Sequence, residues 1–108
     1  MKTIRLNFIF LLLAAAVLAG CSASAFYYND GYSNLAPTNK KDVKIFADRH
    51  IEKAFDEIGY VTINAPNGGS GDEFKALVKE AAAAKGADAV INFRIFGYTA
   101  GGIAIKYK

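Results

Sequence analysis

Residues 70–96 read SGDEFKALVKEAAAAKGADAVINFRIF, and this stretch decides the fold because it holds a helix followed by a strand. Ser70 and Glu73 fit the S-x-x-E capping box that begins helices. Gly86 is a typical stop signal for a helix. Between these signals lies an apolar stripe with the i, i+3, i+4, i+7, i+8 spacing of an amphipathic helix: Phe74, Leu77, Val78, Ala81 and Ala82.

Strands are predicted on both sides of this helix, because apolar and polar residues alternate with a period of two. After the helix, residues 89–96 form the longest such segment, and residues 103–108 form another beyond a glycine turn at 100–102. Before the helix, residues 43–47 and 60–65 alternate in the same way, whereas residues 48–58 combine helical spacing with loop character. The order β-β-α-β-β predicts a single small α+β domain with one helix on one face of a mainly antiparallel sheet.

One helix is narrower than the sheet it covers, since a helix is about 10 Å wide and strands lie about 4.8 Å apart. We therefore expect an apolar face on the side away from the helix, open to a second copy of the chain, to a partner protein or to the N-terminal segment. Alternatively, these aromatic residues merely pair across strands. The candidate interaction face consists of Phe46, Tyr60, Val90, Phe96 and Tyr98.

The N-terminus has the three parts of a secretory signal. Lys2 and Arg5 form a basic head, an uncharged apolar run extends from Phe8 to Ala19, and small residues follow. The run is too short to span a bilayer, which needs about 20 residues. Leu18-Ala19-Gly20-Cys21 resembles a bacterial lipobox, so we expect cleavage between Gly20 and Cys21 and lipidation of the Cys21 thiol, with residues 1–20 as the signal peptide.

A rival cleavage pattern follows at Ala23-Ser24-Ala25, the A-x-A mark of ordinary signal cleavage. Cutting there would release a protein that begins at Phe26 and carries no lipid. The lipobox is favoured because Cys21 is the only cysteine and has no disulfide partner in the chain. Ser22 resembles the residue that allows Gram-negative lipoproteins to leave the inner membrane, which predicts an outer-membrane, periplasm-facing location.

Residues 21–41 are interpreted as the lipidated N-terminus and a flexible tether, because they are rich in Ser, Asn, Gly and Lys and follow no period. The domain is expected at residues 42–108. The tether holds several aromatic residues, which are expected to lie against lipid headgroups or against the domain: Phe26, Tyr27, Tyr28 and Tyr32.

Nothing in the sequence assembles a catalytic site, and no enzyme activity or cofactor is predicted. Asp48, His50, Glu52 and Asp56 are the nearest approach to a metal set, but their spacing is not that of a zinc site, so they are interpreted as a solvated charged loop. Without Lys2 and Arg5 the formal net charge falls from +3 to +1, which argues against nucleic acid as a partner.

Two segments resemble known families: residues 55–61, FDEIGYV, and residues 80–92, EAAAAKGADAVIN. The second resembles a stretch of the YbjQ-like heavy-metal-binding domains, and the likeness extends to the domain of the Rcs stress-sensor lipoprotein, over roughly residues 43–108. The resemblance implies an oligomeric or metal-binding domain. The chain departs from both families, because residues 43–108 contain no cysteine for a disulfide and no cluster of metal ligands.

The sequence as a whole predicts a non-catalytic bacterial lipoprotein, anchored to the membrane through lipid on Cys21, whose domain binds another envelope protein or itself. The alternative is a periplasmic domain that binds a small ligand or a metal ion.

Overall fold

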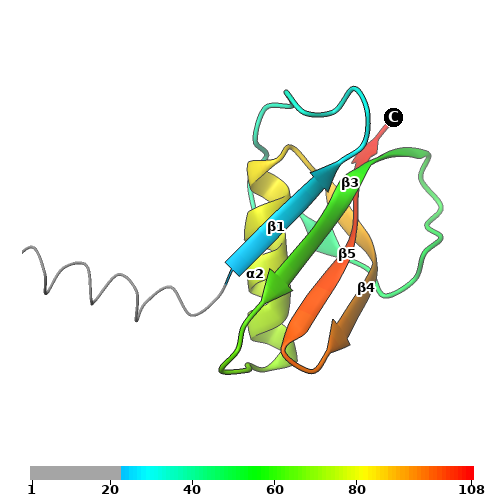
Figure 1. Ribbon diagram of the computed structural model, residues 1–108. Coiled ribbons are helices and arrows are strands. Elements are labelled where there is room, and N and C mark those ends of the chain that lie inside the picture. Colours follow the sequence, from blue (N-terminus) through cyan, green and yellow to red (C-terminus); the bar gives the residue numbers. More distant parts are fainter. Residues whose placement is uncertain (1–22) are drawn as a thin grey trace, which may run out of the picture.

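The computed structural model describes residues 23–108, in which one helix packs on one face of a five-stranded sheet (Figure 1). This arrangement confirms the predicted α+β class. The strand order is β1-β3-β5-β4-β2, and all neighbours are antiparallel except β2 and β4. The elements are β1 (Ala23–Tyr28), β2 (Lys44–Ile45), β3 (Phe55–Asn64), α2 (Gly71–Ala84), β4 (Ala89–Phe96) and β5 (Thr99–Tyr107).

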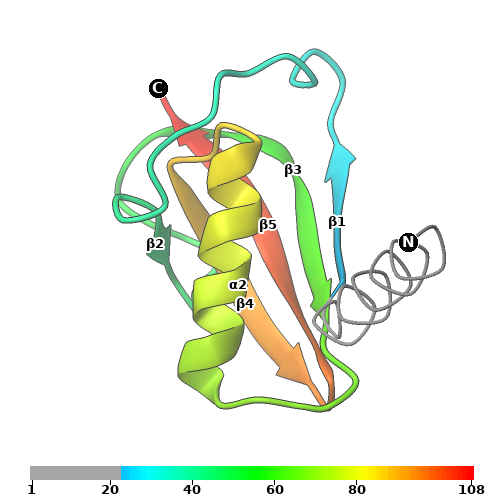
Figure 2. The same ribbon diagram turned by 90° about the vertical axis from the view of Figure 1, so that its left-hand side faces the viewer.

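Helix α2 begins where the sequence predicts. Ser70 is its N-cap, and the Ser70 hydroxyl accepts a hydrogen bond from the Glu73 backbone N–H at 3.2 Å. The helix lies diagonally over the sheet (Figure 2), and four of its residues are buried against it: Phe74, Val78, Ala82 and Ala83. Burial of this apolar stripe, more than helix propensity, is what stabilises a helix of this length.

Gly86 terminates the helix, and no other residue fits there without strain. Its φ is +89°, which side chains with a Cβ rarely adopt. An added Cβ would also lie 2.6 Å from the Leu35 Cβ and 2.8 Å from the Ala36 carbonyl oxygen. The segment after β1 therefore packs directly on the end of the helix.

We expect Gly86→Ala to lower the free energy of unfolding by about 2–4 kcal/mol, the sum of a left-handed backbone cost and an overpacking cost. Gly31→Ala is the matched control, because Gly31 has a φ of +88° but nothing within 4 Å of an added Cβ. Gly31→Ala should cost only about 1–2 kcal/mol, from the backbone alone. Urea unfolding of both variants measures the difference; equal shifts would show that the contact with Leu35 is unimportant.

The prediction of a flexible tether is wrong for Ala23–Tyr28. Ala23–Tyr28 form edge strand β1, which pairs antiparallel with β3 from Ala23 opposite Asn64 to Tyr28 opposite Gly59. The aromatic and small residues that look irregular in sequence have high strand propensity and pair in register. Phe26 packs on the helix side, against the core, which confirms that this aromatic lies against the domain.

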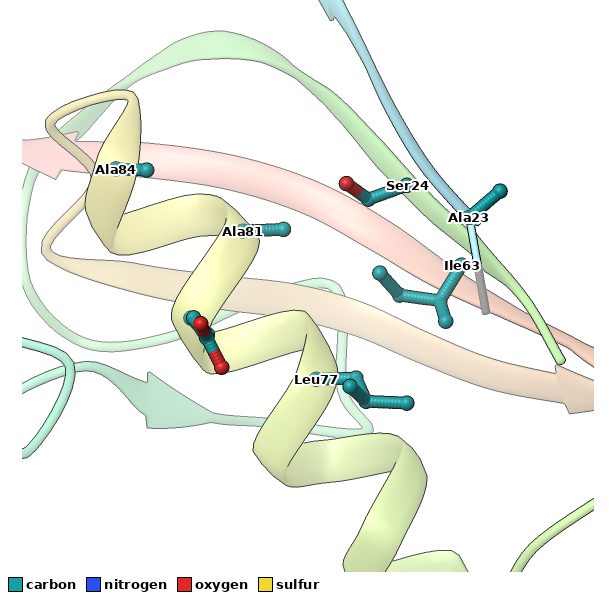
Figure 3. A pocket seen from close by; sticks show the side chains of 7 residues that line it. Ala23, Ser24, Ile63, Leu77, Ala81 and Ala84 are labelled. Atoms are coloured by element: carbon teal, nitrogen blue, oxygen red, sulfur yellow. The ribbon is translucent and has the colours of Figure 1, made fainter. Parts of the chain in front are cut away.

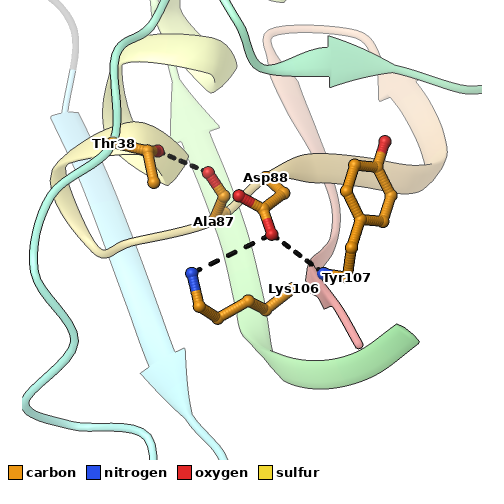
Figure 4. A network of polar contacts seen from close by, with 5 residues as sticks. All are labelled: Thr38, Ala87, Asp88, Lys106 and Tyr107. Carbon is orange, nitrogen blue, oxygen red and sulfur yellow. Dashed lines mark hydrogen bonds and ion pairs between the residues drawn. The ribbon is translucent and has the colours of Figure 1, made fainter. Parts of the chain in front are cut away.

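The segment from Asn29 to Val43 crosses the end of the sheet and connects its two edges (Figure 2). Thr38 fastens it to the end of α2: its backbone N–H donates to the Ala83 carbonyl at 2.8 Å, and its hydroxyl donates to the Ala87 carbonyl (Figure 4). Asp88 continues this network by accepting a hydrogen bond from the Tyr107 backbone N–H at 2.9 Å. The turn of Gly86, Ala87 and Asp88 thus joins three segments of the chain: the end of α2, the segment that contains Thr38, and the end of β5.

The two glycines predicted as a turn lie inside β5, and this prediction is wrong. The turn between β4 and β5 is formed by Gly97 and Tyr98. A Cβ at Gly101 would lie 2.6 Å from the Val61 carbonyl oxygen, and one at Gly102 would lie 2.8 Å from the Ile91 carbonyl oxygen. Glycine is needed at these strand positions because neighbouring strands approach closely, not because the chain reverses.

Candidate functional site

The sheet face away from α2 carries a row of large apolar residues, one from each of four neighbouring strands. The register places Tyr27 opposite Tyr60, Tyr60 opposite Ile103, and Ile103 opposite Ile91. Directly opposed residues project from the same face. Their exposed fractions rise toward the β1 edge: Ile91 is fully buried, Tyr60 is 43% exposed and Tyr27 is 64% exposed.

The loop of residues 46–54 covers the buried end of this row and lies across the sheet from α2 (Figure 1). Its position is fixed by backbone hydrogen bonds from Phe46 N to Val90 O at 2.8 Å and from Asn92 N to Asp48 O at 2.9 Å. Phe46 and Ile51 pack against a small second core of Ala89, Ile91 and Ile105. Phe46 therefore lies on the predicted face, but its side chain packs against its own chain and is not open to a partner.

Val90 was predicted on this face, and this prediction is wrong. Val90 is fully buried on the helix side, in the same core cluster as Val78. The register of β4 shifts between Ile91 and Arg94, where Asn92 adopts a φ of +53°. This bulge places both Val90 and Phe93 on the helix side, because the extra residue interrupts the alternation.

Phe96 and Tyr98 lie at the tip formed by β4, β5 and the turn between them, and they are 69% and 61% exposed. Phe96 is opposite Thr99 in the register. The Tyr98 carbonyl accepts a hydrogen bond from the Ala65 backbone N–H at 2.8 Å, which joins this tip to the loop after β3. Of the predicted face, Tyr60 lies at its centre, whereas Phe96 and Tyr98 lie at one end of the sheet.

An open groove of about 310 Å³ runs between β1 and α2 (Figure 3). Ser24 points from β1 toward Ala81 and Ala84 on the helix, and Leu77 closes one side. Glu80 is its one ionisable lining residue. The polar side chains of the lining are thus one carboxylate, Glu80, and one hydroxyl, Ser24.

The structure brings together three of the four residues of the nearest approach to a metal set, whereas Asp56 lies apart and forms an ion pair with Lys108 at 3.5 Å. Asp48, His50 and Glu52 line a shallow hollow beside Lys44 and Lys53, whose ammonium lies 4.5 Å from the centre of the Tyr107 ring. Within residues 23–108 no three His, Cys, Asp or Glu side chains are placed to hold a metal ion. No polar or charged residue of this same range is buried.

Sequence reasoning missed Tyr27 as part of the sheet face. The sequence feature that indicates a strand here is the run Phe26-Tyr27-Tyr28, since aromatic residues favour strands. The run lacks the alternation of apolar and polar residues that indicates a strand. Alternation is absent because both faces of β1 carry aromatic rings, Phe26 and Tyr28 on one face and Tyr27 on the other.

No family of proteins, no curated protein and no solved structure gave a significant match to this chain. The helix of the described part of the chain is neither long nor apolar enough to cross a membrane.

Proposed function

We propose that this chain is a non-catalytic bacterial lipoprotein, held in the outer membrane by lipid on Cys21, whose domain contacts another envelope protein or a second copy of itself. Cys21 provides the lipid-bearing thiol, and Ser22 favours the outer membrane by its resemblance to Gram-negative lipoproteins. The observation that carries the proposal is the position of β1 relative to the two competing cleavage sites.

Cleavage after Ala25 would remove half of β1. Ala23, Ser24 and Ala25 are paired with Asn64, Ile63 and Thr62, so this cut would leave the end of β3 without its neighbour. Cleavage after Gly20 leaves all six residues of β1 in the mature chain. A processing site that preserves the fold supports the lipobox over the A-x-A site.

The non-catalytic part of the proposal is supported by what the described surface offers. The groove between β1 and α2 contains one carboxylate, Glu80, and the hollow at His50 is open to solvent. Catalytic groups are usually placed within hydrogen-bond reach of one another and shielded from water, and neither place provides this.

The contact surface that we propose is the open half of the sheet face, at Tyr27 and Tyr60. Tyrosine is well suited to such contacts, since its ring is apolar and its hydroxyl stays hydrated. Strand β1 is also an uncharged sheet edge, and protein sheets usually protect such an edge with charge, proline or a cover. A protein contact at this edge would provide that protection.

The test is photo-crosslinking in cells, with a photo-reactive amino acid at position 27 or at position 28 of the full-length chain. These neighbours project from opposite faces of β1. We expect position 27 to form adducts with a second copy or with another envelope protein, and position 28 to form few. If neither position gives an adduct and the extracted protein is monomeric, the proposed contact does not exist.

A further inference from the structure

The end of the domain that bears the lipid is fixed by β1. Cys21 is two residues before Ala23, the first residue of the strand, so at most about 7 Å of chain separates the two Cα atoms. A domain joined this closely cannot stand away from the bilayer that holds the lipid. One end of it must lie at the headgroups.

The register identifies this end. Ala23 is opposite Asn64, Asn64 is opposite Thr99, and Thr99 is opposite Phe96. These four residues form one level across four strands, so Phe96 lies about 15 Å from Ala23 along the sheet. The turn at Gly97 and Tyr98 lies beyond this level, at the lower end of the domain in Figure 1.

The side chains at this end are the ones expected at a lipid interface. Phe96 and Tyr98 are the most exposed large apolar residues of residues 23–108 apart from Tyr27, and Ile95 beside them is also exposed. Aromatic rings are enriched at the headgroup level of membranes, where the ring is apolar and the hydroxyl reaches water. The would-be Cβ of Gly68 lies 3.6 Å from the Tyr98 ring, so the loop after β3 belongs to the same surface.

The lack of charged residues at this end favours contact with the membrane through apolar side chains. Residues 64–71 and 95–100, which form the end, contain no Asp, Glu, Lys, Arg or His. The charged residues that flank these two segments are Asp72 and Glu73, in the first turn of α2, and Arg94, whose guanidinium donates to the Ala47 carbonyl at 2.7 Å. The guanidinium of Arg94, the one cation beside these segments, is hydrogen-bonded within the chain, so the end gains little from anionic lipids and insertion of side chains must provide the contact.

We propose that the β4–β5 tip docks on the phospholipid surface, with Ile95, Phe96 and Tyr98 inserted among the headgroups of the membrane that carries lipidated Cys21. This inference rests on the proposed lipid anchor. Docking fixes the orientation of the domain: the bilayer meets the end of the sheet at which β1 begins. The surface at Tyr27 and Tyr60 then projects sideways along the membrane, where a neighbouring envelope protein can reach it.

Tryptophan fluorescence tests the docking directly, because the chain has no natural tryptophan. Phe96→Trp and Tyr98→Trp each place a single probe at the tip, and Tyr28→Trp places the control about 17 Å further along β1. The lipidated proteins are extracted from cells, checked by intact mass for lipid on Cys21, and reconstituted into phosphatidylcholine vesicles with and without brominated acyl chains.

We expect the probes at positions 96 and 98 to lose most of their emission to the brominated lipid, in low and in high salt, while position 28 keeps its emission. If lipid is present on Cys21 but positions 96 and 98 are quenched no more than position 28, the docking inference is wrong and the anchor stands. Crosslinking of position 96 to a protein in cells, without quenching, would assign the tip to a protein partner instead. Absence of lipid on Cys21 would overturn both proposals.

Discussion

Phe74→Ala is expected to lower the free energy of unfolding by about 3–5 kcal/mol, the usual cost of truncating a buried phenylalanine. Phe74 is only 2% exposed and lies in the core cluster between α2 and the sheet, together with Val61 and Val90. Small domains have total stabilities of about 5–15 kcal/mol, so the variant loses a large part of the total. Thermal and urea unfolding, followed by circular dichroism, measure the loss.

Phe96→Ala is the matched control, since it deletes the same atoms from a side chain that is 69% exposed. We expect its free energy of unfolding to stay within about 0.5 kcal/mol of the original chain. A comparable large loss in Phe96→Ala would mean that Phe96 is buried in solution, for instance in a stable dimer. A loss in Phe74→Ala as small as the one expected for Phe96→Ala would contradict the placement of Phe74 in the helix-side core.

Cys21→Ser is expected to abolish lipidation and to leave the precursor uncleaved. The thiolate is the nucleophile that accepts the lipid, and serine does not replace it at neutral pH. The variant should therefore keep residues 1–20 and yield no lipidated mature protein. Under the rival cleavage after Ala25, the same variant would still mature to a chain that begins at Phe26.

The matched control for processing is Ala25→Leu, which places a large residue at the A-x-A site and leaves the lipobox unchanged. Its mature N-terminus and lipid should be the same as in the original chain. A leucine is tolerated at this position because Ala25 is exposed in β1. Loss of processing in Ala25→Leu but not in Cys21→Ser would favour the rival site. N-terminal sequencing and immunoblotting of cell fractions separate these outcomes.

The helix was predictable because its signals are local. Ser70, the apolar stripe and Gly86 each act within a few residues of their position, and the structure places all three as the sequence indicates. The faces of β4 were not predictable, because Ala89, Val90 and Ile91 are all fully buried. The loop of residues 46–54 covers one face and α2 covers the other, so the alternation that marks a half-exposed strand is lost.

The sequence predicted the candidate face only in part, because local alternation places some of its residues and not others. Tyr60 and Phe96 lie on the open side as predicted, because the register is regular from Gly59 to Asn64 and from Arg94 to Phe96. The prediction for Val90 was wrong because β4 has a bulge at Asn92. The sequence gives no clear signal of this bulge, since the residue with the positive φ is not a glycine. Tyr27 was missed because β1 is stabilised by pairing with β3, which lies more than thirty residues further along the chain.

The central claim is that the mature chain begins at a lipidated Cys21 immediately before β1. The most direct test is the intact mass of the protein extracted with detergent from the membrane fraction of cells that make the natural sequence. The proposal predicts a chain of residues 21–108 that carries a diacylglyceryl group on the thiol and an acyl group on the amine. A soluble chain of residues 26–108 without lipid would contradict it.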